Sequence, residues 1–223
     1  MKIISHELGK VLRLFVADEI HPAQGINLPD LINGIAQRYN FLPPDLSSDN
    51  KGGREFKYGK ININGDLINI SSLTIYSEAV AVNIGDTSKS LIVINDLFDW
   101  LQSEFKFRKP VTQPKDFYES HLVVEFDSDL DNFIKPFAKI SKLLSTLINE
   151  TYDISVKVDF SGFAISADST LLPSYLTPIF NNNFTINRRI GIAFSQNRYY
   201  CTAPFPTDKH IKLLENVENF IKN

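Results

Sequence analysis

The dipeptide Asn64-Gly65 stands between two segments in which apolar residues recur at alternate positions. A two-residue hairpin of type I′ needs positive φ at both central residues, and Asn-Gly is the pair that adopts this conformation most readily. The return strand runs from about Leu67 to Tyr76, and residues 80–84 continue the alternation in a third strand. The sequence therefore predicts an antiparallel meander in its first half.

The strand before this turn changes the phase of its apolar positions. Phe56 and Tyr58 share one face, whereas Ile61 and Ile63 share a face in the opposite phase. A phase change beside a glycine, here Gly59, predicts a β-bulge that inserts one residue into the strand.

Segments with helical spacing separate the predicted strands. A strand over residues 10–16 is followed by a helix that Asn27 caps and that ends near Asn40. Asp86 or Thr87 then caps a second helix, whose apolar residues keep helical spacing as far as Phe105.

The second half repeats this order of elements without repeating its residues. A strand over 117–126 and an amphipathic helix over 130–148 come first. The predicted elements that follow are a strand over 152–160, a strand over 163–167, a hairpin of 184–194 with 199–202, and a last helix that Pro206 and Thr207 open.

The predicted fold class is α+β, with two pseudo-repeated halves. Each half is an antiparallel sheet, in the order strand, helix, three or four strands, helix, with its helices packed on one face. Pro110 and Pro114 mark the predicted boundary. The halves are residues 1–108 and 117–223, the linker is 109–116, and a single integrated domain is the alternative.

Composition limits the class of protein. The chain has 223 residues with 43% hydrophobic residues and a formal charge of −3, which excludes a disordered chain. No apolar run approaches the roughly 20 residues of a membrane helix, so no membrane partner is predicted. With Cys201 as its one cysteine and no signal-peptide pattern, the chain is expected to be cytoplasmic. No cofactor motif is found, so none is predicted.

Two groups of residues are candidates for chemistry, one for metal binding and one for catalysis, although the sequence predicts neither a metal site nor a catalytic site. Carboxylates alternate at Glu125, Asp127, Asp129 and Asp131 and resemble the start of a calcium loop, but Ala138 stands where the bidentate Glu is needed. Helix capping explains the same acids, because negative side chains favour a helix N-terminus.

The second group pairs Cys201 with His210, as a nucleophile and a base. No known local signature of cysteine enzymes surrounds Cys201, and a lone cysteine in a strand is usually a small buried apolar residue.

Charge is distributed unevenly along the second half. Residues 113–168 carry a net charge of −5 and residues 169–223 a net charge of +3. The basic residues of the last hairpin are interleaved with Phe184, Phe194, Tyr199 and Tyr200. Arginine with aromatic residues is typical of both protein interfaces and single-stranded nucleic-acid surfaces. The predicted binding residues are Arg188, Arg189, Arg198, Tyr199, Tyr200, Lys209 and Lys212.

Three hypotheses about function follow. The leading one is a non-catalytic interaction or assembly module that binds a protein partner or forms a homo-oligomer through this Arg/Tyr-rich hairpin. The alternative is a nucleic-acid-binding domain that uses the same surface. The third is a metal-dependent enzyme whose site is assembled between the halves.

Overall fold

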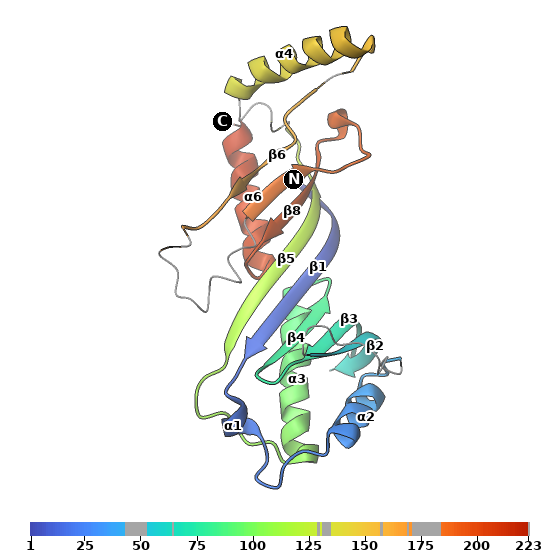
Figure 1. Cartoon of the computed structure of the whole chain (residues 1–223), viewed down its shortest axis with the longest axis vertical. Helices are drawn as coiled ribbons and strands as arrows, with labels where there is room; N and C mark the ends of the chain where they lie inside the picture. Colours follow the sequence, from blue (N-terminus) through green and yellow to red (C-terminus); the bar gives the residue numbers. More distant parts are fainter. Residues whose placement is uncertain are drawn as a thin grey trace. The chain divides into compact units, whose positions relative to one another are not determined.

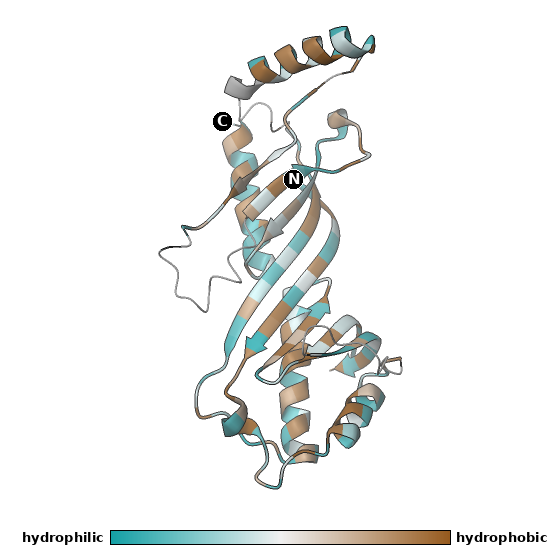
Figure 2. Ribbon diagram, in the orientation of Figure 1, coloured by the Kyte–Doolittle hydropathy of each residue, from teal (hydrophilic) through white to brown (hydrophobic). Residues whose placement is uncertain are grey.

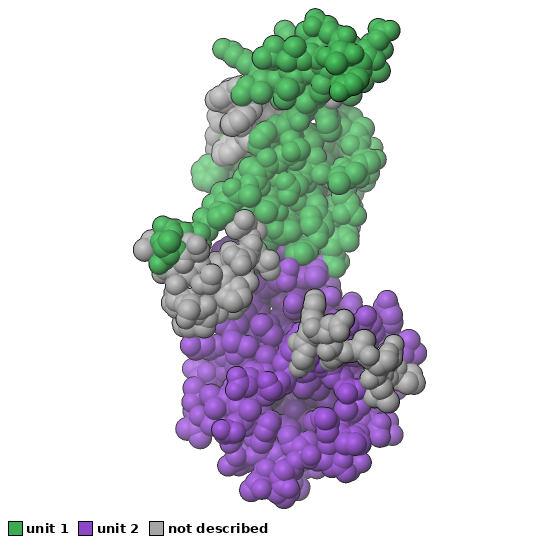
Figure 3. Space-filling model, viewed as in Figure 1, with its two compact units in different colours: residues 1–7, 121–204, 208–223 green, residues 8–120, 205–207 purple. Residues whose placement is uncertain are grey.

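The fold is an α+β arrangement with a large antiparallel sheet (Figure 1). A computed structural model describes residues 1–42, 53–63, 65–128, 130, 135–156, 158–168, 170 and 184–222. The chain divides into two compact units, which Figure 3 shows in different colours. Unit 1 comprises residues 1–7, 121–204 and 208–223, and unit 2 comprises residues 8–120 and 205–207.

Unit 2 holds the meander and the helices of the first half. Strands β1 and β5 contribute residues to both units, since each crosses a unit boundary. The elements are β1 (Lys2–Leu14), α1 (Ala17–Ile20), α2 (Leu28–Arg38), β2 (Arg54–Ile63), β3 (Asp66–Ile75), β4 (Ala79–Ile84), α3 (Thr87–Phe105) and β5 (Lys115–Glu125).

The predicted hairpin at residues 64–65 is confirmed. Ile63 pairs with Asp66 across the turn, and Gly65 has a φ of +89°, which a residue without Cβ adopts freely. Asn64 itself lies outside the described residues.

The predicted bulge in β2 is wrong, although the change of phase is real. Phe56 pairs with Leu73 and Ile61 pairs with Ile68 in one unbroken register, so neither strand gains a residue. All four side chains are buried, hence both strands exchange their inner and outer faces at the same level. Tyr58, with a φ of +56°, lies at that level.

Helix α3 begins as its sequence predicts. Asp86 is the N-cap, and its carboxylate accepts a hydrogen bond of 2.7 Å from the Ser88 amide. The start of α3 packs closely on β1, because a Cβ added to Gly9 would lie 2.5 Å from the Asp86 backbone. Ser90, which is fully buried, donates a hydrogen bond to the Gly9 carbonyl oxygen.

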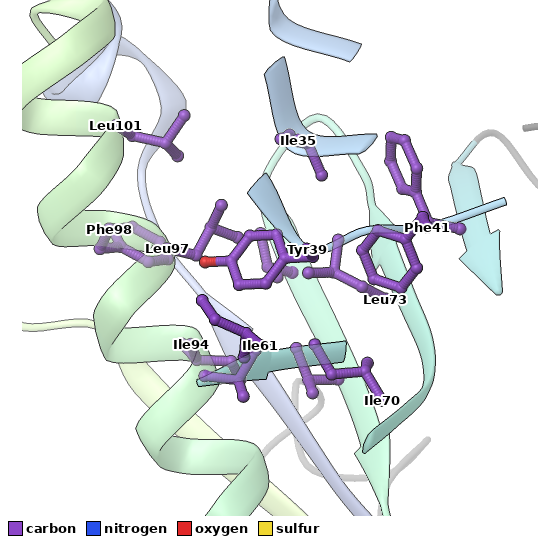
Figure 4. Packing of buried hydrophobic residues seen from close by; sticks show 14 of the residues in the cluster. Ile35, Tyr39, Phe41, Ile61, Ile70, Leu73, Ile94, Leu97, Phe98 and Leu101 are labelled. Carbon is purple, nitrogen blue, oxygen red and sulfur yellow. The ribbon is translucent and has the colours of Figure 1, made fainter. Parts of the chain in front are cut away.

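The core of unit 2 is aliphatic and aromatic. Figure 4 shows residues of α2, α3, β2 and β3 interdigitating around Tyr39, whose hydroxyl donates a 2.8 Å hydrogen bond to Asp96. Buried polar residues of this unit, such as Thr87 and Thr207, carry hydroxyl groups. These two threonines exchange hydrogen bonds through backbone amides and side-chain oxygens, at 2.8 and 3.1 Å. Unpaired buried polar groups are thereby avoided.

Unit 1 combines the ends of β1 and β5 with the elements of the second half. Its elements in the described residues are the first residues of β1, the last residues of β5, α4 (Lys135–Tyr152), β6 (Gly162–Ile165), β7 (Phe184–Arg188), a 3₁₀ turn η3 (Phe194–Gln196), β8 (Arg198–Ala203) and α6 (Thr207–Lys222). Buried residues of β5, β7 and β8 face α6, and the rings of Phe184 and His210 meet edge to face at 6.2 Å.

One strand predicted in this half is wrong. Helix α4 continues to Tyr152, and the described residues among 153–160 form no strand. Side chains of α4 take the backbone hydrogen bonds instead. Asn149 accepts from the Val156 amide and Ser145 from the Val158 amide, each at 2.8 Å. A further difference is that β1 begins at Lys2 rather than Lys10.

The hydrogen-bonded order of the strands is β2-β3-β4-β1-β5-β8-β7-β6. Outward from β1 the order is β4, β3, β2, and outward from β5 it is β8, β7, β6. Three strands follow α4 in the described residues, where the sequence predicts four. The pseudo-repeat of the two halves stays a prediction, as does the boundary at residues 109–116. None of the helices in the described chain combines the length and the apolar run that a membrane crossing requires.

Candidate functional site

Strands β7 and β8 of unit 1 have one buried face and one partly exposed face, which follows from the alternation of their residues. Tyr199 and Cys201 of β8 are fully buried on the side of α6. Arg198, Tyr200 and Thr202 alternate with them and are half-buried on the opposite side. We call this second side the open face.

Strand β7 continues the open face with Thr185 and Asn187. Thr185 pairs with Thr202, and Asn187 pairs with Tyr200. The hydroxyl groups of the two threonines share a hydrogen bond of 2.8 Å across the strands. Such cross-strand pairs hold the register of a sheet and leave it a polar surface.

Tyr200 is the centre of the open face. Its hydroxyl group shares a hydrogen bond of 2.5 Å with Nδ1 of His121, and the two rings meet edge to face at 5.5 Å. The guanidinium carbon of Arg189, which is exposed, lies over the Tyr200 ring at 5.6 Å from its centre. A hydrogen bond and a cation–π contact therefore restrict the orientation of this ring.

An ion pair lies on the same face. Arg198 Nε donates a hydrogen bond of 2.8 Å to the Glu125 carboxylate, and both side chains are about one-third exposed. Because exposed pairs of this kind add little stability, Arg198 is a cation that a ligand can compete for.

Two of the predicted binding residues lie on the buried side instead. Tyr199 has no exposed surface. The Arg188 guanidinium donates to the carbonyl oxygens of Phe160 and Phe194, at 3.0 and 3.2 Å. It also lies over the rings of Phe194 and Tyr199. These contacts give Arg188 a structural role, since its donors satisfy partly buried backbone acceptors.

Lys209 and Lys212 are placed apart from the open face. Both are exposed on α6, the helix that packs on the other side of the sheet (Figure 1). The structure thus brings Arg189, Arg198 and Tyr200 together out of the seven predicted residues, and it adds His121.

The chemistry of a cysteine enzyme is not supported at Cys201. Burial raises the pKa of the Cys201 thiol, so it stays protonated at neutral pH. Burial, with a smaller contribution from His121, lowers the pKa of His210 to about 4. A neutral thiol with no exposed surface lacks the thiolate and the access that a nucleophile needs.

The acidic residues that the sequence offers as candidate metal ligands form ion pairs or lie outside the described residues. Glu125 pairs with Arg198, and Asp127 accepts a hydrogen bond of 2.8 Å from Lys222. Asp129 and Asp131 lie outside the described residues. In the part of the chain that the structure describes, no group of three His, Cys, Asp or Glu residues could hold a metal ion.

His121 is the residue that sequence reasoning missed. It stands alone in the sequence and has no metal-ligand spacing. His121 and Glu125 are an even number of positions apart in one strand, so they lie on the same face. This spacing was the sequence signal that could have placed His121 beside the other site residues. The partner strand could not be inferred, because β5 and β8 are separated by more than seventy residues.

Comparisons with known proteins give no family. No protein-family model matches the chain, and a search of curated proteins finds no match. Among solved structures, the chain is similar to "Methanococcus jannaschii TBP", with 11% sequence identity and a TM-score of 0.44, over 99% of this chain and 97% of that one. A likeness at this level carries no conclusion about activity.

Proposed function

We propose that the chain binds single-stranded nucleic acid through the open face of unit 1. The observation that carries the proposal is the Arg189–Tyr200–His121 arrangement, an exposed guanidinium over a ring that a hydrogen bond to His121 orients. Planar groups of this kind stack on bases, and the arginine also meets phosphate. Thr185, Thr202 and Asn187 add polar groups beside them.

The charges of the open face set the expected affinity. Among its described residues, Arg189 and Arg198 supply positive charge, and Glu125 offsets part of it. Neutralising two phosphates of a single strand gives a slope of about −1.4 in a plot of log K against log salt concentration. The binding we expect is consequently modest and only moderately sensitive to salt.

The test is fluorescence anisotropy with a labelled single-stranded oligonucleotide at several salt concentrations. Arg189→Glu should weaken binding about tenfold or more, because stacking of one base is worth roughly 1–3 kcal/mol and the repulsion adds to that loss. The double variant Lys209→Ala/Lys212→Ala is the matched control. It removes two positive charges from α6 and should change the affinity by less than about twofold.

Two results would contradict the proposal. One is wild-type binding that does not vary with salt. The other is a control variant that binds as weakly as Arg189→Glu, which would mean that overall charge rather than the open face determines the affinity.

A second candidate function, self-association, rests on a different feature. Helix α4 exposes apolar residues along one side, and they appear in brown in Figure 2. These residues are Ile140, Leu143, Leu144 and Leu147, with exposed fractions of 44% to 59%. Apolar positions three and four apart form the stripe of a helix that packs on another helix.

The charges of α4 favour a second copy in antiparallel orientation. Lys139 and Lys142 lie in its first half, Glu150 lies in its last turn, and Asp153 follows its last residue. An antiparallel pair would place each lysine end beside the acidic end of the partner helix.

Light scattering tests the second candidate independently of nucleic acid. A mass twice that of the 25.3 kDa chain, which Leu144→Glu returns to that of one chain, would support it. A single-chain mass for the wild type at high protein concentration would rule it out.

A further inference from the structure

Unit 2 contains a cavity of about 430 Å³ that is independent of the open face. It lies between the helices of this unit and the side of the meander that faces them. Its walls include Ile20, Leu31, Ile35, Phe56, Val80 and Leu101. Protein interiors are normally packed with few voids larger than a water molecule, and ligand pockets span roughly 300–1,000 Å³.

Polar groups of the cavity come from one end of the meander. Arg54, the first residue of β2, pairs with Ile75 near the end of β3, so Arg54, Tyr76 and Ser77 lie near the same edge. His21, which follows α1, also lines the cavity. The apolar body and the polar end of a ligand therefore have separate places in this cavity.

Arg54 is the charged group that defines the ligand. It stands two residues before Phe56, whose ring is fully buried, and therefore on the same face of β2. Its side chain is half-buried, and no carboxylate among the described residues forms an ion pair with it. By contrast, Lys57 of the same strand pairs with Glu55 at 3.1 Å. A guanidinium at the edge of an apolar cavity attracts an anion, and carboxylates match its two parallel donors.

We propose that unit 2 binds an amphipathic organic carboxylate, with its hydrocarbon body in the cavity and its carboxylate on Arg54. At about 30 Å³ for each water-sized group, the cavity holds on the order of a dozen non-hydrogen atoms. A medium-chain fatty carboxylate such as decanoate is of this size. This site concerns a different unit and a different ligand class from the proposed nucleic-acid surface.

The experiment is calorimetric titration of the full chain with decanoate and, separately, with decanol. Decanol has the same hydrocarbon body without the charge. Arg54→Met, which keeps the length of the side chain but not its charge, should weaken decanoate binding about tenfold or more and leave decanol binding unchanged. Lys57→Met is the matched control, because it removes a cation of the same strand whose partner is Glu55. It should bind decanoate like the wild type.

A second variant tests the cavity rather than the cation. Leu31→Phe adds volume to the wall and should weaken the binding of both ligands. If this variant does not fold, the comparison of Arg54→Met with Lys57→Met decides alone. Absence of saturable decanoate binding, or equal affinities of Arg54→Met and Lys57→Met, would overturn the proposal.

Discussion

The two units place helices against one face of antiparallel strands, but they bury different kinds of polar groups. In unit 2, the buried polar residues are hydroxyl-bearing, as at Thr87, Ser90 and Thr207. In the described part of unit 1, they are the ionisable residues His210 and Glu218. Hydroxyl groups do not change charge between pH 4 and 8, whereas a buried imidazole does. Packing should therefore dominate the stability of unit 2, and protonation should matter more for unit 1.

The largest expected effect is a cavity in the core of unit 2. Ile94→Ala should lower the free energy of unfolding by about 3 kcal/mol, because Ile94 is fully buried and its neighbours cannot fill the space. Chemical denaturation measures this loss. Ile92→Ala, which truncates a side chain that is 44% exposed on the same helix, is the control and should cost under about 1 kcal/mol. Equal losses in the two variants would contradict the assigned core.

A pH titration of stability tests the contrasting property of unit 1. The pKa of His210 is lowered to about 4 in the folded chain, below the ordinary value of 6.5. Its contribution to stability is thus complete above pH 6.5 and is lost as the pH falls toward 4. Between pH 7.5 and pH 5 the loss should be about 2 kcal/mol.

His210→Gln isolates this contribution, because the variant has no imidazole to protonate at that position. Its stability should fall less than that of the wild type between the same pH values. His6→Gln, a variant at an exposed histidine, should follow the wild type. If His210→Gln shows the full wild-type pH dependence, other groups are responsible for it.

Arg188 and Arg189 are neighbours in the last hairpin of unit 1, and we expect their replacement to have different effects on stability. Arg188→Ala should lower the free energy of unfolding by about 1–2 kcal/mol, since two backbone carbonyl oxygens lose a charged donor. Arg189→Ala should change it by less than about 0.5 kcal/mol. Thermal denaturation separates them, and amide exchange should place the Arg188 effect in β7 and β8. Indistinguishable melting temperatures would mean that Arg188, like Arg189, adds little to the stability of the fold.

The smallest expected effect on stability concerns the ion pair on the open face. Glu125→Gln should cost between about 0 and 1 kcal/mol, because the pair is partly exposed to solvent. The same change frees Arg198 and removes a negative charge, so oligonucleotide binding should tighten. Anisotropy and thermal denaturation on the same samples would show whether affinity and stability change separately, and weaker binding would argue against the proposed surface.

The sequence was sufficient to predict elements that are determined by interactions between residues close together in the chain. Asn64-Gly65 predicted the hairpin, and Asp86 predicted the start of α3, because turn and cap chemistry involves residues only a few positions apart. The strand predicted over residues 152–160 failed for the opposite reason. Its alternation is real, but Ser145 and Asn149 of the preceding helix take its backbone donors.

The candidate site was predicted in composition but not in orientation. Consecutive residues of a strand point to opposite faces, so Arg188 with Arg189, and Tyr199 with Tyr200, cannot all belong to one surface. Alternation alone says that one of each pair is inside. Which one is inside depends on where α6 packs, and that requires the tertiary fold. The partnership of His121 with Tyr200 was inaccessible for the same reason.

The simultaneous change of face in β2 and β3 makes their alignment unusually specific. In a uniformly alternating hairpin, a slip by two residues keeps every apolar side chain inside, so misaligned pairings compete with the native one. In this hairpin, a slip by two residues would no longer align the change of face in β2 with the change of face in β3. Apolar side chains would then meet polar ones on both sides of Tyr58. The change of phase therefore favours one register over the slipped ones. Misaligned pairings that would otherwise slow the folding of this hairpin become less stable.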